Sequence, residues 1–436
     1  MFLDDGLCGS PLLDRATIDS KEVKGDLLRL GFLLSEEKCF WEPTQKQTCL
    51  GHVFDMSQNL LYVAETRVAR LEQTLAYTTA CSNKVTARQL AAAAGQIVSM
   101  SRAIGSTVYF YTRHIYYAIE TRNHWDSILP ITSDIMAELQ YWKTNVRSLN
   151  GKNMFSEPQH FDTFVYSDAS DQGYGGYAIS NQQRLVCQGH WSENERAKSS
   201  TWRELKAVNN MLLAIGQQLH GHKLQWYTDN QNIVRIVARG SRKPDLQGQV
   251  VEVIQLSKTF NILVCPVWVP REQNQIADYL SKISDGNDWS AHPNIFQWLD
   301  TMWGPFTFDR FATSYSTKCL RFNSCFWNPH CEGVDSYAIN WAGENNSVVP
   351  PPNQIIRAWK HYQICRARGV MVVPLWRGSP FWPSLCPDGI HLAKCITDWV
   401  GIPEWIHPAT LPGRSHNTLF TGEKLPFRLI AMYINW

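Results

Sequence analysis

The sequence predicts a multidomain protein of the α/β and α+β classes, and three observations lead to this fold class. The chain has 436 residues, enough for about two to four domains of ordinary size. Hydrophobic residues make up 44% of it, a fraction typical of proteins with packed cores. Stretches of strand-like and helix-like periodicity follow one another between residues 163 and 282, and a tryptophan-rich segment begins after residue 286.

We expect four parts along the chain. They span residues 1–60, 61–158, 159–284 and 285–436. The first part alternates short apolar runs with turn signals, whereas the second is helical at its start. Val68, Leu71 and Leu75 recur at helical spacing, and Thr86 with Gln89 forms a predicted capping box for the next helix.

The third part predicts a mixed five-stranded sheet covered by helices. The strands are expected at 164–168, 174–179, 184–191, 224–227 and 262–268. The helices are expected at 202–219, 232–239, 250–260 and 274–282. Three consecutive strands followed by alternating helices and strands indicate an α/β plan with antiparallel strands on one side. In the fourth part, 370–373 is the clearest strand.

The charge balance argues against a strongly basic surface. Lys and Arg number 41 and Asp and Glu 39, so the formal net charge is +2. A nucleic-acid site would therefore be a local groove. We find no signal peptide and no apolar stretch long enough to cross a membrane. With twelve cysteines and no Cys-x-x-Cys pair, we expect an intracellular protein with reduced thiols, in the cytoplasm or the nucleus.

Four carboxylates lie at the ends of predicted strands or in predicted helices, and these positions indicate a metal site. Asp168 ends the first strand of the third part, and Glu204 lies in the first turn of its first long helix. Asp229 follows the strand at 224–227, and Asp278 lies in the last helix. If they meet at one sheet edge, their mutual repulsion needs compensation, which two Mg²⁺ ions about 4 Å apart would supply.

Each acid also has a structural explanation. Asp229 could be a helix N-cap, and Glu204 could complete a capping box with Thr201. Asp278 could be a solvated helix charge, and Asp168 could end a turn.

The strings at 166–170, 202–207, 227–230 and 274–281 resemble the ribonuclease H domain of retroelement polyproteins. The resemblance implies a ribonuclease H-like fold and a metal site made by Asp168, Glu204, Asp229 and Asp278. It also implies hydrolysis of the RNA strand in RNA–DNA hybrids with two Mg²⁺ ions, or Mn²⁺ in their place. Many relatives carry a histidine before the last aspartate, but residues 269–273 contain none.

Further residues are candidates for contact with nucleic acid. Glycines in the second strand could allow the backbone to approach RNA, although simple turn glycines are the alternative. Amides near the acids could contact the minor groove. The candidates are Gly173, Gly175, Asn230, Gln231 and Asn274.

The first residues resemble the metal-binding box of reverse transcriptases, an aromatic residue followed by x-Asp-Asp, through Phe2, Asp4 and Asp5. The resemblance implies that 1–60 is the end of a polymerase palm and 61–158 a thumb and connection. Because the sequence starts at the box, we expect a truncated palm, a vestigial metal site and no polymerase activity.

Residues 287–400 resemble the extra domain of DIRS-type retrotransposons, which use a tyrosine recombinase; it is related to adenine N-methyltransferases. Shared strings include 308–312, 321–324, 334–337 and 373–376. The resemblance implies an α/β methyltransferase-like domain, with Asp309 as a candidate contact for S-adenosylmethionine or an ordinary loop aspartate. At 349–352 the sequence is Val-Pro-Pro-Pro. Valine cannot accept a hydrogen bond from adenine, so we do not expect methyl transfer.

Three hypotheses about function follow. The first is a metal-dependent ribonuclease H; the second is a retroelement remnant that binds nucleic acid without catalysis. The third, which we disfavour, is a DNA adenine methyltransferase. The expected partners are an RNA–DNA hybrid or another nucleic acid, and other retroelement-encoded proteins, with no membrane.

Overall fold

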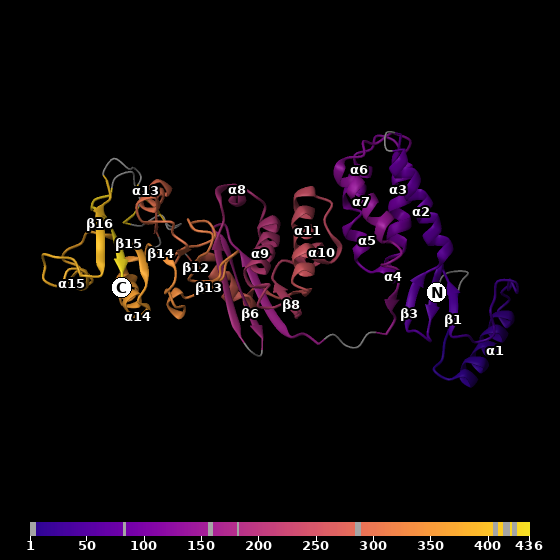
Figure 1. Cartoon of the computed structure of the whole chain (residues 1–436). Helices are drawn as coiled ribbons and strands as arrows, with labels where there is room; N and C mark the ends of the chain where they lie inside the picture. Colours follow the sequence, from indigo (N-terminus) through magenta and orange to yellow (C-terminus); the bar gives the residue numbers. More distant parts are fainter. Residues whose placement is uncertain are drawn as a thin grey trace. The chain divides into compact units, whose positions relative to one another are not determined.

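The computed structural model describes most of the chain. The described residues are 6–81, 84–155, 160–180, 183–283, 289–403, 409–412, 419–420 and 425–436. Asp4 and Asp5, the predicted vestigial polymerase site, lie outside them. The chain divides into two compact units, Met1–His160 with Ala238–Val250, and Phe161–Val237 with Val251–Trp436. Figure 1 labels their elements along the chain, and we describe each unit by itself.

The first unit begins with a helix that the sequence did not predict. Helix α1 (Leu13–Arg29) has no buried residue, so its apolar side chains make no regular buried stripe by which to recognise it. An antiparallel sheet follows, in the order β1-β2-β3-β4. Its strands are β1 (Lys46–Cys49), β2 (His52–Asp55), β3 (Leu60–Val63) and β4 (Lys152–Asn153).

The rest of the first unit is helical. Its helices are α2 (Glu65–Ala80), α3 (Ala87–Ser99), α4 (Ser101–Ile104), α5 (Thr107–Phe110), α6 (Arg113–Glu120) and α7 (Ser133–Asn145). The predicted apolar residues Val68, Leu71 and Leu75 are buried in its core. The predicted capping box is confirmed, since the Thr86 side chain accepts from the backbone of Gln89 and the Gln89 side chain accepts from that of Thr86.

Residues 238–250 belong to this first unit although their neighbours in sequence belong to the second. Gln247 Nε2 donates to the carbonyl oxygen of Phe110 at 2.9 Å. Arg113 Nε donates to the carbonyl oxygen of Arg239 at 2.9 Å. A segment that the sequence placed with the third part therefore packs with the helices that precede it.

The second unit contains the mixed five-stranded sheet that the sequence predicted. Its order is β7-β6-β5-β8-β9. Strands β5, β6 and β7 pair antiparallel, whereas β5, β8 and β9 pair parallel. The strands are β5 (Thr163–Ala169), β6 (Gly173–Ser180), β7 (Arg184–His190), β8 (Lys223–Thr228) and β9 (Leu263–Trp268).

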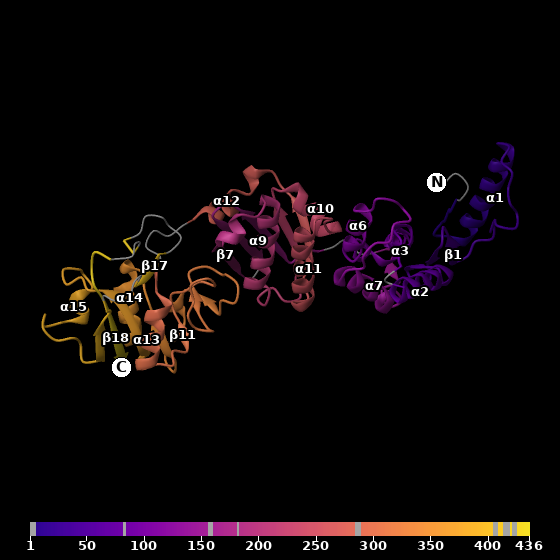
Figure 2. The ribbon, with the colours of Figure 1, turned by 90° about the horizontal axis from the view of Figure 1, so that it is seen from above.

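The helices around this sheet match the prediction in part: the sequence predicted neither the short helix at Glu193–Arg196 nor the 3₁₀ turn at Arg271–Gln273, and the first long helix ends at Ile215, not at Leu219. They are α8 (Glu193–Arg196), α9 (Ser200–Ile215), α10 (Gln231–Arg239), α11 (Pro244–Thr259) and α12 (Gln275–Lys282), preceded by the 3₁₀ turn η1 (Arg271–Gln273). Helix α11 begins at Pro244, not at Val250 as predicted; proline is favoured in the first helical turn, where its missing N–H costs nothing. Figure 2 shows α9 and α11 beside the strands.

The core of this sheet lies between the strands and α9. Val165, Trp226 and Leu212 are buried together there. Trp226 Nε1 donates to Ser167 Oγ at 2.8 Å, which ties β8 to β5. Helix α12 packs against β5 and β6 and so brings residues from the end of this segment to the carboxyl end of its first strand.

The rest of the second unit contains another mixed sheet, in the order β11-β14-β15-β18-β16. Strands β11, β14 and β15 are parallel, whereas β18 is antiparallel to both β15 and β16. These strands are β11 (Phe308–Asp309), β14 (Asn345–Val348), β15 (Arg368–Pro374), β16 (Ile396–Gly401) and β18 (Leu429–Asn435). Strand β15 contains the predicted strand at 370–373.

Short strands, turns and helices complete this part. They are β10 (Trp289–Ala291), α13 (Pro293–Trp303), β12 (Asn323–Ser324), β13 (Gly333–Val334), η2 (Ser336–Ala338), η3 (Pro352–Gln354), α14 (Ile355–Cys365), α15 (Trp382–Leu385) and β17 (Thr410–Pro412). Trp289, Trp341 and Trp359 are buried core residues. In the described part of the chain, no helix combines the length and the apolar character needed to cross a membrane.

Candidate active site

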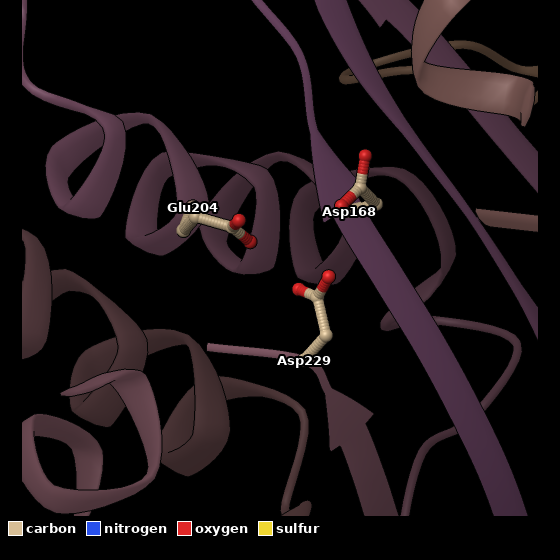
Figure 3. Close-up of side chains that lie close together, drawn as sticks. All are labelled: Asp168, Glu204 and Asp229. Atoms are coloured by element: carbon tan, nitrogen blue, oxygen red, sulfur yellow. The ribbon is translucent and has the colours of Figure 1, made fainter. Parts of the chain in front are cut away.

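Three of the four predicted acids meet at one edge of the first sheet of the second unit. Asp168 lies in β5, Glu204 in α9, and Asp229 directly after β8. Each offers a carboxylate oxygen, and these oxygens all lie within 4.8 Å of one another. Figure 3 shows the three side chains converging from a strand, a helix and a strand end.

The local sequence explains this convergence. Strands β5 and β8 are parallel neighbours, so their carboxyl ends reach the same edge of the sheet. Helix α9 begins after Ser199, whose side chain accepts from the backbone N–H of Trp202 at 3.3 Å. Because Ser199 is the N-cap, Thr201 and Glu204 do not form the capping box considered as an alternative, and Glu204 is free to face the sheet edge.

Burial and mutual repulsion leave two of these acids poorly stabilised as anions. Asp168 and Glu204 are each only 6% exposed. Burial raises the pKa of Glu204 well above its usual value, and the charges of Asp168 and Asp229 raise it further. Burial also raises the pKa of Asp168, although a hydrogen bond from Ser281 Oγ to Asp168 Oδ2 (2.7 Å) opposes this effect. Among the described residues, no side chain donates a hydrogen bond to the Glu204 carboxylate.

The chemistry of this donor set fits a hard divalent cation. Mg²⁺ binds oxygen ligands at about 2.1 Å, so opposite ligands of one ion lie about 4.2 Å apart. The three carboxylate oxygens lie within 4.8 Å of one another, a limit compatible with ligands of one such ion. A bound cation would also offset the mutual repulsion of these three carboxylates.

The fourth predicted acid, Asp278, lines the same pocket but is not within the group of three. Its carboxylate is held by two cations: Arg271 Nη2 lies 2.8 Å from Oδ1, and Lys282 Nζ lies 2.6 Å from Oδ2. Burial alone would raise the pKa of Asp278, but hydrogen bonds from Lys282 and Arg271 outweigh it and lower the pKa.

The four acids line an open pocket of about 580 Å³. Acids and cations are both present in it, together with one tryptophan. Its lining residues are Asp168, Ala169, Ser170, Ser200, Glu204, Asp229, Asn230, Gln231, Trp268, Arg271, Asp278 and Lys282. Such a pocket can hold a metal ion beside a phosphate group.

Three of the predicted nucleic-acid contacts are buried and have a packing role in the structure, so their contact with nucleic acid stays a prediction. Gly173 and Gly175 are buried, and a Cβ atom would lie 2.3 Å from the carbonyl oxygen of Gly189 or from the backbone nitrogen of Ser281, respectively. Close packing of strands and helix explains both glycines. Asn274 is also buried, and its Nδ2 donates to the carbonyl oxygen of Ser167 at 3.0 Å.

Asn230 and Gln231 do line the pocket, and their contact with nucleic acid stays a prediction. Four residues at or beside the site were not predicted from the sequence, namely Arg271, Lys282, Ser281 and Trp268. The spacing of Asp278 and Lys282, four residues apart on one helix, was an available signal for one ion pair.

The predicted site around Asp309 has a different character. Asp309 ends β11 and is buried, and its Oδ2 accepts from the backbone N–H of Lys318 at 3.1 Å. Burial raises the pKa of Asp309 to about 6. The adjoining cavity measures about 10 Å³, room for about one water molecule. The structure therefore gives the S-adenosylmethionine hypothesis no support.

Comparison with known proteins gives a match for the segment that carries the acids. Residues 160–284 match the family model described as reverse transcriptase-like. A comparison with curated proteins gave no match.

Solved structures with similar segments include three enzymes. Ribonuclease H1 from Halobacterium salinarum is 20% identical over 27% of this chain and 92% of its own, with a TM-score of 0.23. LC11 ribonuclease H1 bound to an RNA/DNA hybrid is 18% identical over 27% of this chain and 92% of its own, with a TM-score of 0.21. A foamy viral protease-reverse transcriptase bound to double-stranded DNA is 12% identical over 59% of this chain, with a TM-score of 0.30. The match spans 44% of that viral chain.

Proposed function

We propose that this protein is a metal-dependent ribonuclease H that hydrolyses the RNA strand of RNA–DNA hybrids. The observation that carries the proposal is the group of Asp168, Glu204 and Asp229. Their carboxylate oxygens lie within 4.8 Å of one another, and none of the three forms an ion pair among the described residues. Two buried acids that meet a half-buried third without a cation paired to any of them support a site completed by a divalent metal ion.

The sequence supports the same proposal independently. The strings around the four acids resemble the retroelement ribonuclease H domain, and the matched family model covers all four positions. We further propose two Mg²⁺ ions, with Mn²⁺ as a substitute, Asp278 as the fourth acid of the site, and a DIRS-type retroelement origin. The absence of methyl transfer by residues 285–436 stays a prediction.

The chain's own residues would perform the following roles. Asp168, Glu204 and Asp229 would hold the metal, which supplies an activated water and neutralises charge on the phosphate. Ser281 orients Asp168 through its hydrogen bond of 2.7 Å. Trp268 Nε1 donates to the carbonyl oxygen of Asp229 at 3.0 Å and fixes the end of β8. Arg271 and Lys282 place positive charge beside the pocket, where phosphates of a nucleic-acid strand would lie.

The test is cleavage of a labelled RNA–DNA hybrid by the purified full chain. Wild type should cut the RNA strand with Mg²⁺ and not with a chelator. Asp168→Asn should lower the rate by at least about a hundredfold, because it removes a metal-binding charge from a site that relies on electrostatic stabilisation. The matched control is Asp171→Asn, since the Asp171 side chain is 90% exposed and pairs with Arg203.

Two outcomes would contradict the proposal. If wild type and Asp168→Asn cut equally well, the activity does not come from this site. If wild type binds the hybrid but never cuts it with either metal, the alternative of a nucleic-acid-binding remnant is correct. Circular dichroism should show the same fold for all three proteins.

A further inference from the structure

Asp278 differs from the three neighbouring acids because two cations hold both of its oxygens. Arg271 comes from the turn that follows β9, and Lys282 is the last residue of α12. The two ion pairs measure 2.8 Å and 2.6 Å. All three side chains line the pocket that contains Asp168, Glu204 and Asp229. The two cationic side chains of the pocket are thus both paired with Asp278, the one acid outside the group of three.

These ion pairs are open to competition. The side chains of Arg271 and Lys282 are 68% and 50% exposed, and exposed ion pairs contribute little, about a fewfold in an equilibrium constant for each pair. A phosphate group accepts strong charge-assisted hydrogen bonds from both arginine and lysine. A nucleic-acid strand that enters the pocket therefore brings a competing ligand for both cations.

We propose that Arg271 and Lys282 form a latch on Asp278 that the phosphates of a bound nucleic acid open. In the closed latch, Asp278 is bonded to the two cations and does not bind metal. When phosphate oxygens take over Arg271 and Lys282, the Asp278 carboxylate becomes free to join Asp168, Glu204 and Asp229 as a metal ligand. This inference rests on the proposed function, because it assumes that the pocket receives nucleic acid and divalent metal.

The metal half of the latch can be tested without nucleic acid and without activity. Mn²⁺ binding to the full chain would be titrated by electron paramagnetic resonance. The double variant Arg271→Gln, Lys282→Gln should bind Mn²⁺ about threefold to tenfold more tightly than wild type, or bind one ion more, because Asp278 is released. In the Asp278→Asn background, the same two changes should give no gain, since there is no carboxylate to release.

A simple effect of charge would give a different pattern. If the two cations only repel the metal, their removal improves Mn²⁺ binding equally whether residue 278 is Asp or Asn, and the latch is wrong. The latch is also wrong if the double variant shows no gain. The matched control is Arg88→Gln, which breaks an exposed Arg–Asp pair of 3.0 Å outside the pocket and should leave Mn²⁺ binding unchanged.

The phosphate half of the latch requires a nucleic-acid probe. Binding of a fluorescent DNA duplex would be measured by anisotropy across a range of salt concentrations. If both cations move to phosphates, Arg271→Gln, Lys282→Gln should weaken binding and reduce the slope of log K against log salt by about two. An unchanged slope would refute contact with phosphate, and Arg88→Gln should leave the slope as in wild type.

Failure of the latch and failure of the proposed function remain distinguishable. The double variant Asp168→Asn, Asp229→Asn should lose Mn²⁺ binding whatever stands at positions 271 and 282. If it still binds Mn²⁺ as wild type does, the metal site itself is wrongly placed. If it loses Mn²⁺ while the latch variants behave as wild type, only the latch is refuted.

Discussion

At the scale of single residues, the ionised carboxylate of Glu204 lowers the stability of the metal-free protein. Its carboxyl group is buried beside Asp168 and Asp229, and its pKa is raised by burial and by those charges. A buried acid with a raised pKa ionises more readily in the unfolded chain than in the folded one. Glu204 therefore makes its full contribution to folding stability at a pH below the pKa that it has in the unfolded chain. This contribution is lost as the pH rises through the pKa that Glu204 has in the folded protein.

Glu204→Gln should accordingly stabilise the metal-free protein at pH 8, because glutamine keeps the shape without the charge. A gain of about 1 kcal/mol would raise the melting temperature by about 2–4 °C in a domain of this size. Thermal unfolding with a chelator measures the difference, which should vanish near pH 4. A variant that melts below wild type at pH 8 would show that Glu204 is not under electrostatic strain.

At the scale of elements, the contact between β6 and α12 decides whether the site can form. A Cβ atom on Gly175 would lie 2.3 Å from the backbone nitrogen of Ser281 and 2.4 Å from the carbonyl carbon of Leu280. Neither contact involves a flexible side-chain end, so the helix itself would have to move. Because Ser281 bonds Asp168 and Asp278 lies in the same helix, a shift of α12 disturbs two acids together.

Gly175→Ala should therefore destabilise the protein by about 1–3 kcal/mol, as overpacking of a buried contact does, and should weaken Mn²⁺ binding. The matched control is Gly248→Ala in α11, where a Cβ atom meets nothing within 4 Å. That change should be neutral or stabilise by up to about 1 kcal/mol, because alanine favours helix. Equal stability of both variants, measured by denaturant unfolding, would contradict the close packing of α12 on β6.

The elements also show where sequence periodicity succeeds. The predicted limits of β5 lie within one residue of the observed ones, because burial largely alternates along this strand, whereas α9 ends four residues before its predicted end. Helix α1 was missed because it buries no residue, so its pattern gives no core-facing stripe. The early start of α11 was missed because its first turn packs with residues such as Phe110, a partner more than a hundred positions away.

At the scale of the whole molecule, the two units have separate cores. Trp142 is fully buried in the helical core of the first unit, and its Nε1 donates to the carbonyl oxygen of Tyr111 at 2.7 Å. Asp168, Glu204 and Asp229 all belong to the second unit. Metal binding should thus depend on the second unit and tolerate damage to the core of the first.

Trp142→Ala should cost the first unit about 3–5 kcal/mol, as removal of a buried aromatic side chain does. We expect calorimetry to show one unfolding transition moved to lower temperature and a second one unchanged. Mn²⁺ affinity at a temperature below both transitions should equal that of wild type. A single transition that moves as a whole, with loss of Mn²⁺ binding, would show that the two units unfold as one.

The sequence by itself determined the mixed five-stranded sheet and most of its helices, and it offered the four candidate acids, because periodicity and motif spacing are local properties of the chain. Only the tertiary structure showed that Asp168, Glu204 and Asp229 meet while Asp278 is bonded to Arg271 and Lys282. It also showed that Gly173, Gly175 and Asn274 are buried in packed contacts. The physical reason is that ion pairs and close packing depend on which residues, distant in sequence, become neighbours in the folded protein. Spacing along the chain does not specify these neighbours.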